Sequence, residues 1–215
     1  MKKLIIICEG PSEQTFCDKI LKPHFVAIDI NVSFPLIAHS NGGIVKWVHL
    51  KPDIELNHTA DNNAFITTFI DYYGIKAHHG FPQWVNAHLQ ADRPTRMTTL
   101  EIGMLADLSA TAQQKFIPNI QLHEFEALTL SDANAFGQYY APHEFNNAGI
   151  TALCANAPET VNNGAATAPS KQLKANIPAY DKVTDGTELA KLIGLTTIRA
   201  KCPRFNQWIT KLEAL

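Results

Sequence analysis

Three apolar segments of this chain each lead into acidic residues, and this repeated pattern constrains the fold most strongly. Continuous apolar runs of this length are typical of parallel strands that are buried on both faces. Ligands bind outside the carboxyl ends of such strands, so we expect the acids to meet at one edge of a sheet. The segments and their acids are Lys3–Cys8 with Glu9, Ala64–Ile70 with Asp71, and Phe116–Leu122 with Glu124 and Glu126.

Helical patterns alternate with these strands and predict an α/β fold, a Rossmann-like, mostly parallel sheet flanked by helices. One helix is expected from Ser12, as its N-cap, to Pro23, another from the Gly42-Gly43 pair onward, and a third from Thr98, as its N-cap, to Leu108. A further strand over Val32–Ala38 contains a proline, which favours an edge position because proline cannot donate to a neighbouring strand.

The last third of the chain differs from the rest in composition and in the pattern of its apolar residues. This difference predicts a core over residues 1–135 and a helical extension over residues 136–215. Ala155–Ser170 has almost no large apolar residue and is expected to be a mobile loop. A helix is predicted up to Gly194 and a last one from Pro203, whose Phe205 and Trp208 lie on its apolar face. We expect this extension to pack against the sheet.

Composition excludes several classes of protein. The chain has 215 residues, 46% of them hydrophobic, and a net charge of −2; this suits one α/β domain without a global basic field. Residues 171–215 carry a local excess of four positive charges. The four cysteines are scattered, which argues against a zinc knuckle or a disulfide framework. No segment has transmembrane length and Glu9 interrupts the first apolar run, so we expect a cytoplasmic protein.

The acids themselves indicate a cation. Converging carboxylates raise one another's pKa unless a cation neutralises them, and hard divalent cations prefer oxygen ligands. We therefore expect Glu9 and Asp71 to bind Mg²⁺ or Mn²⁺, together with Glu124 or Glu126, with Glu124 slightly preferred. The simpler alternatives are a helix-end charge for Glu9 and a turn-forming residue for Asp71.

Several cationic residues are candidates for phosphate binding. Lys182 is expected to point toward the acids as electrostatic support for catalysis, the alternative being a solvated lysine. As a surface lysine, it is expected to contribute little to stability. His123 is expected to be a hydrogen-bonded core or supporting residue rather than a ligand. The candidate nucleic-acid contacts are Lys171, Arg199 and Arg204, for each of which the alternative is a solvated face.

Three groups of residues resemble a bacterial family known as domain of unknown function 4276. They are Glu9-Gly10-Pro11-Ser12-Glu13, Thr67 to Gly74 together with Phe116 to Leu128, and a final group of Tyr180-Asp181-Lys182, Gly186 and Arg199 to Trp208. That family is similar to the Toprim fold and to the nuclease module of overcoming-lysogenization-defect proteins. The resemblance spans nearly the whole chain.

The resemblance implies roles for individual residues. Glu9 matches the glutamate at the end of the first Toprim strand, a metal ligand or general acid/base. Asp71 matches the first acid of an Asp-x-Asp motif, but Tyr73 stands where the second is expected. A phenol is a poor Mg²⁺ ligand at neutral pH. Either Glu124 or Glu126 replaces the missing acid, or the site holds one metal.

These patterns favour a Mg²⁺- or Mn²⁺-dependent nuclease acting on DNA or RNA. The resemblance also implies an ABC-type or SMC-like ATPase partner in a phage-defence system, because relatives are often encoded beside such ATPases. The alternative is a latent regulatory or toxin subunit that docks to the ATPase. A nucleotide-binding enzyme is disfavoured, because Gly10 alone does not make a glycine-rich phosphate loop.

Overall fold

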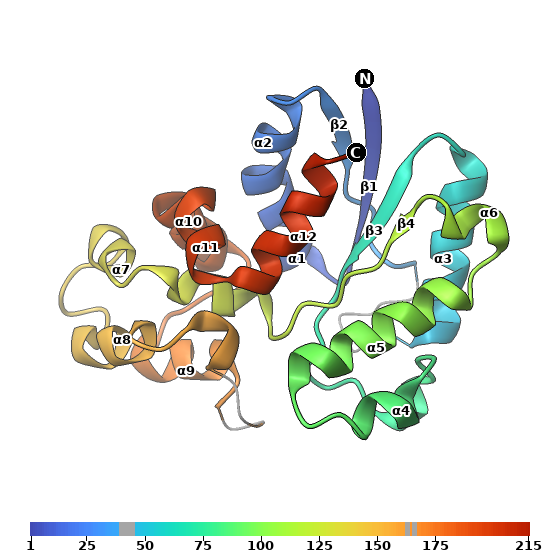
Figure 1. The fold of residues 1–215 in the computed structure, drawn as a ribbon. Coiled ribbons are helices and arrows are strands. Elements are labelled where there is room, and N and C mark those ends of the chain that lie inside the picture. The colour runs from blue at the N-terminus through green and yellow to red at the C-terminus, as the bar shows by residue number, and fades with distance from the viewer. Residues whose placement is uncertain (39–45, 162–163, 165–166) are drawn as a thin grey trace.

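A four-stranded parallel sheet forms the centre of the molecule in the computed structural model, which describes residues 1–38, 46–161, 164 and 167–215. Its strand order is β2-β1-β3-β4, and all three pairings are parallel. The predicted α/β class with a parallel sheet is therefore confirmed (Figure 1). The second strand is at the edge as predicted, but it spans Ile30–Ser33 rather than Val32–Ala38 and ends before Pro35. The strands are β1 (Lys2–Cys8), β2 (Ile30–Ser33), β3 (Phe65–Phe69) and β4 (Phe116–Ile117).

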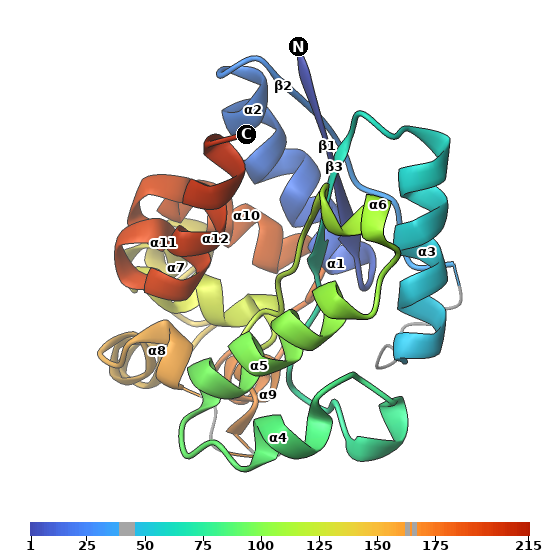
Figure 2. The same cartoon turned by 45° about the vertical axis from the view of Figure 1, so that its right-hand side comes forward.

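Helices cover both faces of the sheet, because alternate residues of each strand point to opposite faces. In β1, Leu4 and Ile6 join one hydrophobic cluster, whereas Ile7 joins the other. The first face is covered by α1 (Pro11–Phe16), α2 (Lys22–Val26), α10 (Thr184–Ile193), α11 (Leu195–Lys201) and α12 (Pro203–Glu213). The second face is covered by α3 (Trp47–Ala60), α5 (Arg93–Ala106) and α6 (Ala110–Gln113), as Figures 1 and 2 show.

Shorter elements complete the fold, most of them beyond the carboxyl end of the sheet. They are the π-helical turn η1 (Cys17–Leu21), the 3-10 helices η2 (Ala77–His79), η3 (Phe125–Ser131) and η4 (Pro158–Thr160), and the helices α4 (Trp84–His88), α7 (Asn134–Tyr139), α8 (Asn147–Cys154) and α9 (Pro169–Asn176). No helix among the described residues is long and apolar enough to cross a membrane.

Some predicted helix boundaries are wrong. The first helix starts at Pro11 with Gly10 as N-cap, and it continues past Pro23 to Val26. The π-helical turn η1 precedes α2, so Pro23 falls in a first turn, where a missing N–H is tolerated. The third predicted helix starts at Arg93 rather than Thr98. The start expected at Gly42-Gly43 lies outside the described residues.

The strand predicted over Phe116–Leu122 is regular only at its first two residues, because the proline that follows has no N–H to donate. Beyond this point, hydrogen bonds from side chains replace the backbone hydrogen bonds between β3 and this segment. The Thr68 hydroxyl donates to the carbonyl of Asn119 at 2.6 Å, and the Asn119 amide donates to the carbonyl of Thr68 at 3.0 Å. Asp71 and Gln121 then form an isolated parallel bridge. The segment therefore still follows β3 to the carboxyl edge.

The C-terminal helices pack against the sheet, as predicted. The Trp208 indole N–H donates to the Thr67 hydroxyl at 2.9 Å, and its ring stacks on Phe69 with centroids 5.2 Å apart. The segment Ala155–Ser170, expected to be a loop, contains η4 and the start of α9 among its described residues. A core boundary at residue 135 stays a prediction, and one hydrophobic cluster includes residues from both sides of it.

Candidate functional site

The carboxyl ends of β1 and β3 bring Glu9 and Asp71 together. The backbone N–H of Glu9 donates to the Phe69 carbonyl at 3.1 Å, and the backbone N–H of Asp71 donates to Glu9 Oε2 at 2.8 Å. The Glu9 side chain therefore reaches across from its own strand to the end of its neighbour. Adjacent parallel strands impose this proximity, since their ends lie at the same edge.

The third chain segment reaches the same edge before it turns into η3. The backbone N–H of Tyr72 donates to the Gln121 carbonyl at 2.8 Å. Because η3 starts at Phe125, Glu124 and Glu126 do not point the same way, as they would along a strand. Glu124 Oε2 accepts from the Ser170 backbone N–H at 3.0 Å, whereas the side chain of Glu126 is fully buried.

Lys182 is the positive charge within this group of acids. Its Nζ lies 3.3 Å from Glu126 Oε2 and 3.6 Å from Glu13 Oε1. These ion pairs agree with the predicted direction of Lys182. They contradict the expectation of a merely solvated lysine, because the side chain is 36% exposed and both partners are buried. We call Glu9, Glu13, Asp71, Glu124, Glu126 and Lys182 the carboxylate cluster.

Glu13 is the member of the cluster that the strand-end pattern does not indicate. It lies in the first turn of α1 and its side chain is only 5% exposed. The available signal was its spacing, since the helix after Gly10 turns Glu13 back toward the end of β1. An acid in the first turn also stabilises a helix through its dipole, which gives Glu13 an ordinary structural explanation.

Burial and mutual repulsion raise the pKa values of three acids. Burial is the main cause for Glu9 and Glu126, and it raises the pKa of each to about 7. Burial, followed by the charge of Glu9, also raises the pKa of Asp71 well above its usual range. Burial lowers the pKa of Lys182, but the surrounding carboxylates raise it by more. The net pKa therefore lies above the ordinary value of a lysine, and the side chain stays charged.

Three buried carboxylate oxygens of this cluster lack a hydrogen-bond partner. Asp71 Oδ1 and both carboxylate oxygens of Glu126 are buried without a hydrogen-bond partner, which is costly unless a charge lies nearby. Lys182 partly supplies that charge. Within the described ranges, no three Asp, Glu, His or Cys side chains already stand as a metal-binding group. The unsatisfied oxygens favour Glu126 over Glu124 as the third acid, against the slight preference from sequence.

The candidate nucleic-acid contacts are not gathered at this edge. Arg199 pairs with Glu213, with Nη2 2.9 Å from Oε2, and donates to Asn206. Arg204 pairs with Glu101 of α5 at 2.5 Å. Both guanidinium groups therefore stabilise the fold through internal ion pairs. Lys171 is exposed on α9 and remains available to a partner.

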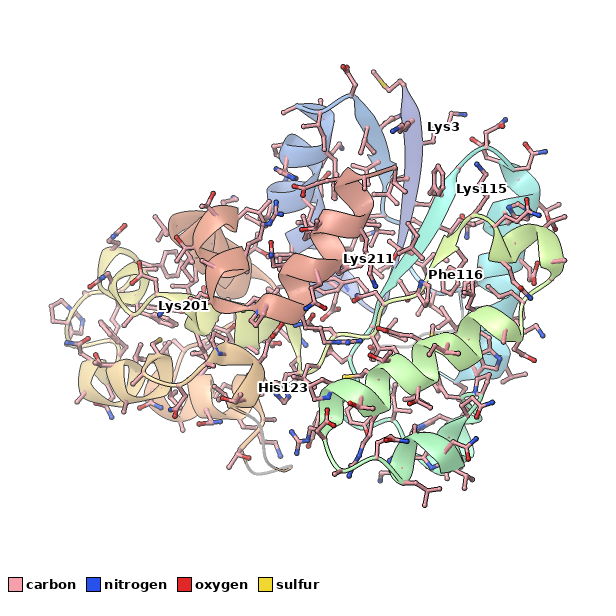
Figure 3. The ribbon with its side chains drawn as sticks, viewed as in Figure 1. Lys3, Lys115, Phe116, His123, Lys201 and Lys211 are labelled. Atoms are coloured by element: carbon pink, nitrogen blue, oxygen red, sulfur yellow. The ribbon has the colours of Figure 1, made fainter. Side chains whose placement is uncertain are left out.

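His123 is buried and hydrogen-bonded, in line with the preferred interpretation. Its Nε2–H donates to the Glu159 carbonyl at 2.7 Å. Burial is the main cause that lowers its pKa to about 4, so the ring is neutral at physiological pH. Figure 3 places His123 at the carboxyl end of the sheet, whereas Lys3 and Lys115 lie at the opposite end.

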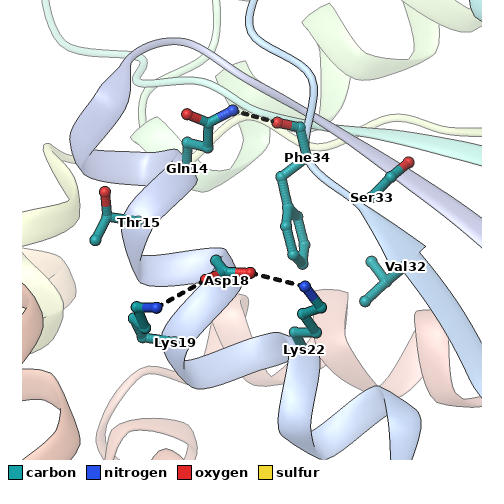
Figure 4. Close-up of a pocket in the computed structure, with 8 residues that line it drawn as sticks. All are labelled: Gln14, Thr15, Asp18, Lys19, Lys22, Val32, Ser33 and Phe34. Carbon is teal, nitrogen blue, oxygen red and sulfur yellow. Dashed lines mark hydrogen bonds and ion pairs between the residues drawn. The ribbon is translucent and has the colours of Figure 1, made fainter.

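A cavity of about 510 Å³ lies away from these acids, between η1 and the edge strand β2 (Figure 4). Its two lysines, Lys19 and Lys22, are both paired with Asp18, at 3.1 and 3.0 Å. Since the lysines are already neutralised in part, the cavity offers no strong charge for a ligand. The carboxylate cluster is therefore the stronger candidate for a functional site.

Comparisons with known proteins support the expected family. The family described as "Domain of unknown function (DUF4276)" matches residues 8–213. The chain is also similar in structure to the C-terminal region of the Burkholderia pseudomallei OLD protein. The similarity has a TM-score of 0.49 with 17% sequence identity, and it covers 99% of each chain. No curated protein is significantly similar in sequence.

Proposed function

We propose that this chain, which belongs to the DUF4276 family, is a Mg²⁺- or Mn²⁺-dependent nuclease that hydrolyses phosphodiester bonds of DNA or RNA. The observation that carries the proposal is the gathering of buried acids at the carboxyl edge of the sheet, with unsatisfied oxygens on Asp71 and Glu126. Such a group is costly for folding alone, and a divalent cation would balance its charge.

Glu9, Asp71 and Glu126 are the residues that would hold the cation. The unsatisfied oxygens of Asp71 and Glu126 match its preference for oxygen ligands. A bound cation would supply charge stabilisation for the phosphate and a more acidic water. Because no three-ligand group is preformed among the described residues, the acids would shift away from Lys182 when the cation binds.

The protein's own groups then divide the remaining work. Burial raises the pKa of Glu9 to about 7 in the metal-free protein, and a bound cation would favour the ionised carboxylate that ligates it. Lys182 remains protonated and can stabilise negative charge on the phosphate. Glu13, 3.6 Å from Nζ, positions this lysine.

A cleavage assay with two conservative variants tests the proposal. Glu9→Gln and Asp71→Asn keep the side-chain shapes but remove the charges, so we expect each to lower Mn²⁺-dependent cleavage by about a hundredfold or more. Lys2→Ala, an exposed change at the opposite end of β1, should leave cleavage unchanged. Melting curves would verify that all variants fold. Full activity in both acid variants would contradict the proposal.

The alternative is a latent subunit that becomes active on docking to an ABC-type or SMC-like ATPase. The ion pair between Lys182 and Glu126 favours it, because the lysine now balances the charge that a cation would balance. Cleavage measured with and without the ATPase separates the two proposals. Activity only in the mixture supports the latent subunit, whereas equal activity in both conditions supports an autonomous nuclease.

A further inference from the structure

A second group of polar side chains lies beside the carboxylate cluster and has no role in the chemistry proposed above. It lines a cavity of about 180 Å³, and its side chains include Arg93, Arg96, Tyr72, Tyr73 and His123. None of the described lining residues is acidic. We call this cavity the arginine pocket. It combines two fixed positive charges with neutral rings, in contrast to the acids next to it.

The arginine pocket is lined by residues that directly adjoin members of the carboxylate cluster in the chain. Tyr72 directly follows Asp71, and His123 directly precedes Glu124, so both strand ends lead from one site into the other. The hydrogen bond from the Tyr72 N–H to Gln121 fixes the two ends side by side. The first turn of α5 supplies both arginines, and His123 lies beside that turn in Figure 3.

Hydrogen bonds hold the walls of the pocket in place. Arg96 Nε donates to the Gln90 carbonyl at 2.9 Å, and the Tyr72 hydroxyl lies 3.3 Å from His88 Nε2. His123 directs its Nε2–H to Glu159. Arg96 thus uses Nε for the fold, and among the residues that the structure describes its terminal nitrogens have no partner, so they can donate to a ligand. A pocket built in this way is preorganised and loses little entropy on binding.

We propose that Arg93 and Arg96 bind a backbone phosphate of the nucleic-acid strand, next to the phosphate that is cut at the carboxylate cluster. This inference rests on the nuclease function proposed above. A guanidinium group matches phosphate geometry through paired N–H donors. The neutral Tyr73 phenol does not repel a phosphate, as a carboxylate there would.

The size and charge of the pocket select this ligand. Its volume of about 180 Å³ is below the range of roughly 300–1,000 Å³ that is usual for sites enclosing a whole small molecule. A phosphate with its sugar, held as part of a strand crossing the surface, needs less room. The acids of the carboxylate cluster repel a polyanion, so a nearby cationic site would hold the strand during cleavage.

Binding of a labelled single-stranded oligonucleotide, measured by fluorescence anisotropy over a salt series, tests the inference. All proteins carry Glu9→Gln to prevent cleavage, and Ca²⁺ replaces Mg²⁺. We expect Arg93→Ala and Arg96→Ala each to weaken binding roughly three- to tenfold at low salt, because each removes one phosphate contact. Each should also reduce the slope of log K against log salt by about 0.7, the value for one phosphate contact on a single strand.

Two further variants control for charge and folding. Lys2→Ala removes one exposed positive charge at the far end of β1 and should leave affinity and slope unchanged. Arg96→Lys keeps the charge but not the paired donors, so we expect weaker binding with an unchanged slope.

The possible failures are distinguishable. If both alanine variants bind like Lys2→Ala while the parent protein binds the strand, the arginine pocket is not a phosphate site, and the proposed nuclease function stands. If the parent binds neither DNA nor RNA, the inference and the proposed function both fail.

Discussion

At the scale of single residues, the raised pKa of Glu126 is the clearest sign that the site is not built for stability. The side chain is fully buried, and its pKa rises to about 7 from an ordinary value of 4.5. The folded state therefore holds the proton more tightly than the unfolded state. This contribution to stability is fully present below pH 4.5 and is lost as the pH rises through about 7.

Glu126→Gln should remove the loss of folding stability that Glu126 causes as the pH rises. Without metal, we expect the variant to exceed the parent in unfolding free energy by up to about 3 kcal/mol at pH 8. Near pH 4, where Glu126 is protonated, the two should agree within about 0.5 kcal/mol. Urea unfolding at both pH values measures the difference.

Glu188→Gln, on an exposed helix surface, is the matched control and should change stability by less than about 1 kcal/mol at either pH. The same pH dependence in parent and Glu126→Gln would contradict this assignment.

Sequence alone could identify Glu9, Asp71 and Lys182 as candidates, because strand ends and charge patterns are local signals. It could not decide between Glu124 and Glu126, since the choice depends on where η3 begins. It also could not separate Arg199 and Arg204 from true ligand contacts. Their acidic partners, Glu213 and Glu101, are found only once the helices pack.

At the scale of elements, α10 packs tightly against η3. Lys182 lies just before α10 and Glu126 lies in η3, so this packing places the two side chains beside each other. Gly186 of α10 makes this approach possible. A Cβ at that position would lie 2.6 Å from Phe125 Cζ and 3.0 Å from the Tyr180 hydroxyl oxygen. The two elements would therefore have to move apart if the glycine were replaced.

Gly186→Ala should destabilise the fold by about 1–3 kcal/mol, because overpacking outweighs the better helix propensity of alanine. Gly137→Ala in α7 is the matched control, since a Cβ there meets nothing within 4 Å. The control should be neutral or stabilising by up to about 1 kcal/mol. Chemical denaturation of both variants provides the comparison. An equally stable Gly186→Ala protein would show that α10 and η3 are not closely packed.

Some elements could not be predicted because tertiary contacts stabilise them. The segment before α9 looked like a loop, yet Glu159 in η4 accepts the backbone N–H groups of Arg204 and Phe205 at 3.1 and 2.9 Å. The Glu159 carboxylate therefore accepts backbone N–H groups in the first turn of α12, although it lies far from α12 in the sequence. A local pattern contains no sign of such a contact, whereas Gly194 and Pro203 mark helix ends locally and were predicted correctly.

At the scale of the whole molecule, the apolar strand pattern was sufficient to predict a parallel sheet with acids at its carboxyl edge. The sheet order and the final position of each acid required the three-dimensional structure. Helices cover both faces of the sheet, which leaves its carboxyl edge as the place for the chemistry that we propose. The carboxylate cluster and the arginine pocket, for which we propose a cation and a phosphate, are formed by adjoining residues at this edge.

The most direct test of this account is the anomalous difference density of a crystal soaked in Mn²⁺ at pH 8, where acids with a pKa of about 7 are largely ionised. We expect a peak at the carboxylate cluster, roughly 2.0–2.6 Å from oxygens of Asp71 and of Glu9 or Glu126. We also expect Lys182 to have moved away from Glu126. A saturating soak that leaves the Lys182–Glu126 ion pair intact, with no peak at these acids, would contradict the metal-dependent mechanism.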